Sequence, residues 1–144
     1  MLERSCILAA DDEESDLLLL EMAFQRAGLS DRLLLARNGK EAIDYLQGRP
    51  MADGTCLSER PQLLLLDVKM PYLSGFEVLE WLSSHAEYRD LPVVMLSSSA
   101  NESDIARALE LGARDYLVKP VGMHQLTDLL KQVREKYLTK PLAR

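Results

Sequence analysis

Five short apolar segments alternate with longer amphipathic segments, and this alternation limits the fold more than any other feature. The apolar segments are residues 5–10, 32–36, 61–66, 92–97 and 115–119. Their length and their content of leucine, valine and isoleucine predict buried strands. Strands that alternate with helices predict a parallel sheet covered on both faces. We therefore expect an α/β fold and a single domain over residues 1–144, with a long loop at 49–61 and a short tail at 139–144.

The segments between these strands carry apolar residues at helical spacing. Asn38 is placed to cap the second helix, and Gly28, Gly48 and Gly112 follow helical stretches as stop signals. The positions expected to face the core are Leu17, Leu20, Phe24 and Ala27, then Ala42, Tyr45 and Leu46, then Phe76, Leu79 and Leu82, then Ile105, Ala106 and Leu109, and finally Met123, Leu126, Leu130, Val133 and Tyr137.

Asp67 ends the most apolar run of the chain, LLLLD. A carboxylate in such a place needs a cation or hydrogen bonds. The other strands also end in polar residues: Asp11 and Asp12, Ser97, and Lys119. In a parallel sheet these strand ends meet at one edge, where ligands bind.

Carboxylates so placed repel one another, at a cost of ~4 kcal/mol for a pair 4 Å apart at an effective dielectric constant near 20. A divalent cation would relieve the repulsion. The ligands on offer are oxygens, without a nearby histidine or cysteine, so the sequence predicts Mg²⁺ rather than zinc. His85 and His124 fall in or beside helical segments and are predicted to be surface residues without a role in the site.

Charge and hydropathy argue against several classes of partner. The net charge of −6 disfavours direct binding to nucleic acid. No apolar run approaches the ~18 residues of a transmembrane helix, and the N-terminus turns acidic before a secretory signal could form. We therefore expect a cytoplasmic protein without membrane contact. Cys6 and Cys56 could form a disulfide, but reduced thiols are the expected state.

Four motifs, in this order, resemble those of the response-regulator receiver domains of two-component signalling: ILAADDEE, LLLLDVKMPYLSG, VVMLSSS and DYLVKP. The resemblance covers residues 5–138. It implies a flavodoxin-like, doubly wound, five-stranded parallel sheet of order 2-1-3-4-5 with five helices. It also implies that Asp67 accepts a phosphoryl group from a sensor histidine kinase or a phosphotransfer protein. The loop at 49–61 and the segment DDEESDLLLLEMAFQRAG further resemble stand-alone receivers paired with bacterial phytochromes.

The resemblance also implies a role for each site residue. Asp11 and Asp12 would hold Mg²⁺ together with Asp67 and the backbone carbonyl of Lys69. Ser97 would bind the phosphoryl group, Lys119 would pair with it, and Tyr116 would be the aromatic side chain that moves on switching. Ser97 stands where threonine is commoner, and Ala10 where a bulkier residue is usual. Neither departure removes a functional group.

Three other interpretations fit these motifs less well. A phosphatase of the haloacid-dehalogenase type also starts from a strand that ends in Asp, but it needs a second Asp where Lys69 stands. A dinucleotide-binding fold would need a G-x-G-x-x-G motif after the first strand, and the sequence has none there. The alternative that stays open is a receiver-like module that binds partners without phosphorylation, although the intact acidic site weighs against it.

The expected output is binding rather than catalysis, beyond self-phosphorylation from a donor and autodephosphorylation. The residues after 138 are too few for an output domain, so we expect signalling through a downstream protein that the sequence does not name. The face of the fourth helix, fifth strand and fifth helix is the expected switch surface. The stripe from Met123 to Tyr137 fits the core and equally fits a helix-paired homodimer.

Overall fold

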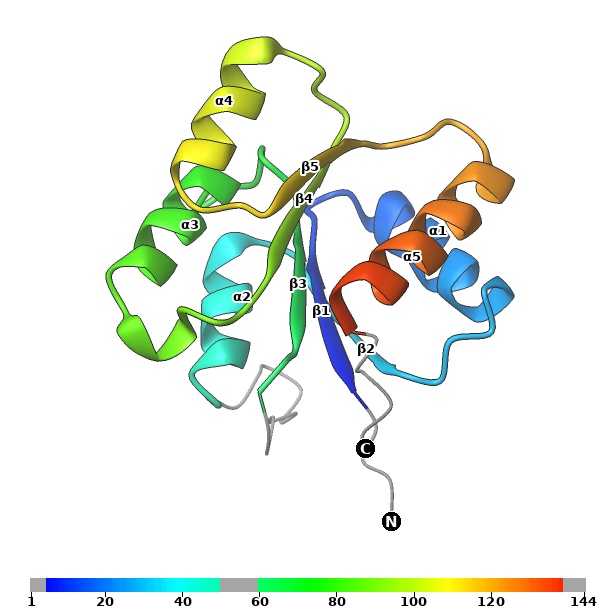
Figure 1. Ribbon diagram of the computed structural model, residues 1–144, viewed down its shortest axis with the longest axis horizontal. Coiled ribbons are helices and arrows are strands. Elements are labelled where there is room, and N and C mark those ends of the chain that lie inside the picture. The colour runs from blue at the N-terminus through cyan, green and yellow to red at the C-terminus, as the bar shows by residue number, and fades with distance from the viewer. Residues whose placement is uncertain (1–4, 50–59, 139–144) are drawn as a thin grey trace.

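Five parallel strands form the central sheet of the computed structural model, which describes residues 5–49 and 60–138. The strands run in the order β2-β1-β3-β4-β5 (Figure 1), which confirms the predicted fold. Their bounds are β1 Cys6–Ala10, β2 Arg32–Ala36, β3 Leu63–Leu66, β4 Val93–Ser97 and β5 Asp115–Val118. The 49–61 loop lies mostly outside the described residues, as do the 139–144 tail and Cys56.

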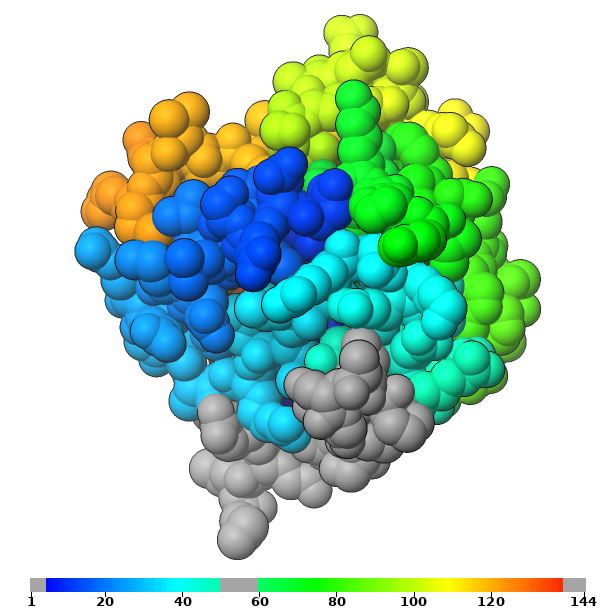
Figure 2. All heavy atoms as spheres, turned by 180° about the vertical axis from the view of Figure 1, so that it is seen from behind, coloured from blue at the N-terminus to red at the C-terminus, as the bar shows by residue number. Residues whose placement is uncertain are grey.

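Helices cover both faces of the sheet (Figure 1). Two of them, α1 and α5, pack on one face, while α2, α3 and α4 pack on the other. Figure 2 shows the opposite side of the molecule, where α1, α2 and α3 lie next to one another. The bounds are α1 Glu14–Arg26, α2 Gly39–Leu46, α3 Gly75–Ser83, α4 Glu102–Glu110 and α5 Met123–Leu138, with a short 3₁₀ helix, η1, at Ala86–Tyr88.

The run of four leucines in β3 explains why the sheet needs two helical layers. Leu64 and Leu66 belong to the core on the α2 and α3 side, and Leu63 and Leu65 to the core on the α1 and α5 side. All four are buried. Burial of one such side chain contributes roughly 1.5–3 kcal/mol, so β3 favours a position with apolar packing on both faces.

Local signals at the helix ends agree with the sequence. The side chain of Asn38 accepts a hydrogen bond from the Glu41 N–H at 2.8 Å, which caps α2 as predicted. Ser74 and Glu77 form a reciprocal capping box at the start of α3. This cap fixes α3 directly after the loop that carries Asp67.

No helix within residues 5–49 and 60–138 is long and apolar enough to cross a bilayer.

The predicted core face of the fourth helix was wrong. Ala108 is the buried residue of α4, whereas Ala106 and Leu109 are exposed and Ile105 is half-buried. The inward side is marked by Ala108, which belongs to the buried core, and by Leu111 at the end of the helix, which packs against that core. A methyl side chain at Ala108 lets α4 approach the sheet closely, and Leu109 is left on the outer side with 46% exposure.

Candidate functional site

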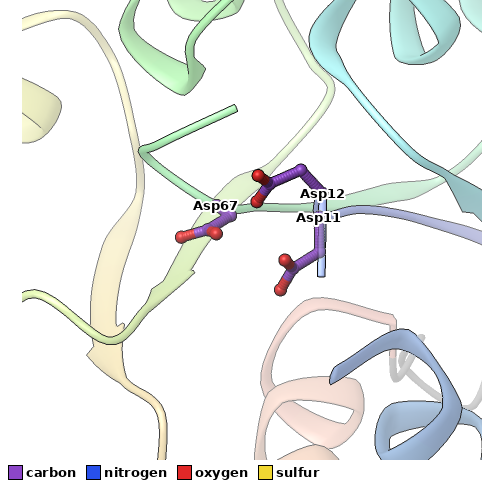
Figure 3. Close-up of side chains that lie close together, drawn as sticks. All are labelled: Asp11, Asp12 and Asp67. Atoms are coloured by element: carbon purple, nitrogen blue, oxygen red, sulfur yellow. The ribbon is translucent and has the colours of Figure 1, made fainter. Parts of the chain in front are cut away.

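Three carboxylates meet where β1 and β3 end. Ala10 pairs with Leu66 in the parallel register, so the residues that follow, Asp11 and Asp67, leave the sheet side by side. The Asp67 N–H donates to the Ala10 carbonyl at 3.0 Å and extends this pairing. Asp11, Asp12 and Asp67 each offer one oxygen within 4.8 Å of the others (Figure 3). Asp11 and Asp67 are buried, and Asp12 is exposed.

The backbone around Asp67 is held from two sides. Its Oδ1 accepts a hydrogen bond from the Val68 N–H at 2.8 Å. The Gly75 N–H donates to the Val68 carbonyl at 2.8 Å, which brings the start of α3 against the Asp67 peptide. A Cβ atom on Gly75 would lie 2.2 Å from the Asp67 carbonyl oxygen. Only glycine fits at this contact, and the fit fixes where the Asp67 side chain begins.

Burial and charge change the acidity of Asp67. Its pKa is raised from 3.8 to about 6, chiefly because burial disfavours the charged form and secondly because the Asp11 carboxylate lies nearby. Lys119 and hydrogen bonds from Val68 and Ser97 act in the opposite direction. Asp67 is therefore mostly ionised at neutral pH.

Lys119 brings the positive charge of the site and follows β5. Its Nζ lies 2.5 Å from Asp11 Oδ2, 2.8 Å from Asp16 Oδ2 and 3.6 Å from Asp67 Oδ2. Burial alone lowers the pKa of Lys119, but the hydrogen bonds to Asp11 and Asp16 outweigh burial, and the pKa is raised. The ammonium stays charged throughout the physiological range.

Asp16 is the residue of this group that the sequence did not single out. It lies in the first turn of α1, where an acidic side chain also fits the helix dipole. Because acidic residues are common in a first helical turn, the sequence gives no sign of the contact between Asp16 and Lys119, which lies 103 positions away. The signal available was its place one turn beyond the Asp11–Asp12 pair.

A chain of hydrogen bonds leads from the end of β4 to β5 and α4. The Ser97 side chain is buried, and its Oγ accepts from the Ser99 N–H at 3.2 Å. The Ser99 hydroxyl donates to Asp104 Oδ2 at 2.7 Å. The Tyr116 hydroxyl donates to the Ser99 carbonyl at 2.9 Å, and the Tyr116 ring is half-buried. Ser98, between Ser97 and Ser99, is exposed.

The remaining predicted residues lie apart from this network. The Lys69 side chain is exposed on the loop after β3, in an open hollow that Asp12 also lines. His124 is exposed on α5, as predicted. His85 is instead half-buried, because its ring stacks on Trp81 with centroids 4.0 Å apart and its Nδ1 lies 2.7 Å from the Trp81 carbonyl oxygen. Neither histidine belongs to the Asp11–Asp12–Asp67 group.

The donor set suits a hard divalent cation. Every side-chain ligand on offer in the group Asp11, Asp12 and Asp67 is a carboxylate oxygen, and such oxygens are preferred by Mg²⁺ and Mn²⁺. The buried, ionised Asp67 beside a charged lysine is also the arrangement expected of a carboxylate that acts as a nucleophile.

Comparison with known proteins gives a consistent result. A response regulator receiver domain model matches residues 7–131. The chain is 33% identical to the probable methanogenesis regulatory protein FilR2 of Methanothrix harundinacea, over 92% of this chain and 83% of that protein. It is 32% identical to the response regulator Rcp1 of Synechocystis, over 89% of this chain and 83% of Rcp1.

Solved structures agree with the sequence matches. The phosphorylated cyanobacterial phytochrome response regulator RcpA superposes with a TM-score of 0.83 at 30% identity, over 95% of this chain and 96% of RcpA. The Mn²⁺-bound form of Rcp1 superposes with a TM-score of 0.79 at 28% identity, over 97% of this chain and 99% of that one. The chain belongs to the response regulator receiver domain family.

Proposed function

We propose that this receiver domain accepts a phosphoryl group on Asp67 from a sensor histidine kinase or a phosphotransfer protein. The observation that carries the proposal is the group of three carboxylates beside the Lys119 ammonium at the carboxyl edge of the sheet. Two of these carboxylates, Asp11 and Asp67, are buried, and buried charges are costly for a fold to keep. Functional sites keep such charged groups because their charge takes part in the reaction.

The transfer forms one bond and breaks another. An oxygen of the ionised Asp67 attacks phosphorus while the phosphorus–nitrogen bond of the donor phosphohistidine breaks, and the bonding electrons return to the imidazole nitrogen. The product is an acyl phosphate. Because Asp67 has a pKa of about 6, no separate base is needed to ionise it near neutral pH.

Asp11, Asp12, Asp67 and the Lys69 backbone carbonyl would hold Mg²⁺. When bound, the metal would supply positive charge for the phosphoryl oxygens. Lys119 lies within 3.6 Å of Asp67, so it would pair with a phosphoryl oxygen after a small movement. The Ser97 hydroxyl, which already contributes to the electrostatics of Asp67, would donate to another.

Phosphorylation would then change the face made by α4, β5 and α5. When the Ser97 hydroxyl turns to the phosphoryl group, the Ser99 N–H loses its acceptor and the loop before α4 can shift. Tyr116 contacts this loop through the Ser99 carbonyl, so its ring would follow. A local change of charge would thereby favour one of two packings of this face.

The partners in this proposal are proteins. A cytoplasmic sensor kinase would provide the phosphoryl group, and the switched face would bind a downstream protein or a second copy of the chain. The name of RcpA, a phytochrome response regulator, favours a phytochrome-type kinase as the donor. We infer no reaction on another substrate, only phosphorylation of the domain itself and hydrolysis of its acyl phosphate.

The test uses acetyl phosphate as a small donor with Mg²⁺ and intact-protein mass spectrometry. The unaltered protein should gain one phosphoryl group, and Asp67→Asn should gain none. Asp128→Asn is the matched control, since Asp128 is exposed on α5 and is not part of the Asp11–Asp12–Asp67 group. A chelator should suppress labelling. Acid-stable labelling of Asp67→Asn would contradict the assignment, and an unlabelled native protein would favour a module that binds partners without phosphorylation.

A further inference from the structure

We propose that Asp16 is a positioning residue that holds the Lys119 ammonium on the α1 side of the site, beyond hydrogen-bonding distance of Asp67, until a phosphoryl group arrives. The inference rests on the proposed function, because it assigns Asp16 a part in preparing Asp67. The Lys119 ammonium is shared unequally among three carboxylates, those of Asp11, Asp16 and Asp67.

The distances show which carboxylates hold the ammonium. Nζ lies 2.8 Å from Asp16 Oδ2, within hydrogen-bonding distance, and 3.6 Å from Asp67 Oδ2, beyond it. Asp11 is the second hydrogen-bond acceptor. An ammonium has three N–H donors. Two are therefore used on Asp11 and Asp16, and the third stays available for a new acceptor.

The side chains around the Lys119 ammonium on the α1 side are mostly apolar. A small hollow of roughly 60 Å³ adjoins Lys119, and its walls include the apolar side chains of Leu20, Leu96 and Leu126. Asp11 and Asp16 are the acidic groups in that wall. Asp16 is fixed by the first turn of α1, whose N-terminal dipole favours a negative charge there.

The position of Lys119 decides how free Asp67 is. If the ammonium closed onto Asp67, it would compete with Mg²⁺ for the same oxygens and would weaken the carboxylate as a nucleophile. Asp11 alone would not prevent this closure, because Asp11 is itself an expected Mg²⁺ ligand. Asp16 lies outside the Asp11–Asp12–Asp67 group, so it can hold the ammonium while those three bind the metal.

The first experiment measures Mg²⁺ binding to the unphosphorylated protein by isothermal titration calorimetry. Asp16→Asn keeps the shape of the side chain and removes its charge, and it should raise the Kd for Mg²⁺ by about three- to tenfold. Glu14→Gln is the matched control: it removes one charge from the same turn, and its side chain is 85% exposed. The control should change the Kd by less than about twofold.

A second measurement separates positioning from a long-range charge effect. Asp16→Asn is combined with Lys119→Met, and with Lys119→Gln as a second choice, and thermal unfolding verifies that each variant is folded. If Asp16 acts by holding the ammonium, its removal should change the Kd by less than about twofold once Lys119 is gone. Equal increases in both backgrounds would overturn the proposal, and so would an Asp16→Asn value no larger than that of Glu14→Gln.

The same variants distinguish this inference from the proposed function. With acetyl phosphate at saturating Mg²⁺, Asp16→Asn should slow labelling of Asp67 several-fold while the final extent of labelling is reached. An unlabelled native protein would contradict the proposed function, whereas the calorimetric comparison would still decide whether Asp16 positions Lys119.

Discussion

The hydroxyl of Tyr116 donates a hydrogen bond to the backbone carbonyl of Ser99, with an oxygen–oxygen distance of 2.9 Å. Ser99 also donates from its N–H to Ser97 and from its hydroxyl to Asp104. Ser99 therefore connects three parts of the domain: Ser97 at the end of β4, the first turn of α4, and Tyr116 on β5. A displacement at Ser97 has a short path to the outer face of the domain.

We predict that Ser97→Ala uncouples phosphorylation from this face. The substitution removes the hydroxyl that accepts from Ser99 and would donate to the phosphoryl group, but it leaves Asp67 in place. Hydrogen exchange with and without beryllofluoride and Mg²⁺ should show a several-fold smaller difference over residues 98–121 than in the native protein. Ser98→Ala changes the exposed neighbour and should retain the full difference. A native protein whose protection does not change on adding beryllofluoride would rule out the switch.

A second prediction concerns the pH dependence that Asp67 gives to stability. Its folded-state pKa of about 6 is above the ordinary value of 3.8, so the folded state binds a proton more readily than the unfolded state does. Stability from this group is therefore greatest at acidic pH and is lost as pH rises through about 6. Asp67→Asn removes the penalty and should raise the free energy of unfolding at neutral pH by on the order of 2 kcal/mol.

Urea denaturation in a chelating buffer measures this effect at several pH values. The gain from Asp67→Asn should nearly vanish by about pH 4, where the Asp67 carboxyl is protonated in the folded state. Asp12→Asn is the control, because Asp12 is exposed and should give a smaller gain. A gain for Asp67→Asn that is the same at both ends of the range would mean that its carboxylate carries no penalty.

Gly75 supports the third prediction. Because its Cβ would meet the Asp67 carbonyl oxygen at 2.2 Å, Gly75→Ala must shift the peptide that carries the nucleophile. We expect a loss of about 2 kcal/mol in the free energy of unfolding and about tenfold slower labelling from acetyl phosphate, although every carboxylate is intact.

Gly122→Ala is the matched control for this change. A Cβ there would meet only the flexible end of the Gln125 side chain, which can rotate away. This control should retain nearly native stability and labelling. If Gly75→Ala matched it in both measurements, the contact between α3 and the Asp67 peptide would have no influence on the site.

The strands could be predicted from the sequence because burial on two faces leaves a simple mark. The four leucines of β3 have no polar face, and the residues that directly follow β1 and β3 have to meet once the strands are parallel and adjacent. That Asp11 and Asp67 lie at the same edge of the sheet followed from this rule. The strand order did not, because apolar pattern is the same for any order, and it came from the resemblance to receiver domains.

The parts that could not be predicted depend on tertiary contacts. The inward face of α4 is set by how closely the helix approaches the sheet at Ala108, a small residue that carries a weak hydrophobic signal. His85 resembles a surface residue in sequence, yet Trp81 covers its ring. An aspartate suits the first turn of a helix whether its side chain faces water or Lys119, so the sequence does not distinguish the two environments of Asp16.

The last prediction concerns a partly buried ion pair that joins α5 to the start of β2. Arg134 Nε lies 3.0 Å from Asp31 Oδ2 and Nη2 lies 3.3 Å from Oδ1, and the Asp31 side chain is only 2% exposed. Arg134→Met would leave that carboxylate buried without its cation. We expect the free energy of unfolding to fall by about 3 kcal/mol, measured by urea denaturation at neutral pH.

Two comparisons isolate the cause. Lys40→Met breaks an ion pair whose lysine side chain is 68% exposed, and should cost less than about 1 kcal/mol because water screens such pairs. Asp31→Asn combined with Arg134→Met removes both charges and should recover part of the stability lost in Arg134→Met. If the double variant were no more stable than Arg134→Met alone, the loss would come from missing arginine packing rather than from an unpaired carboxylate.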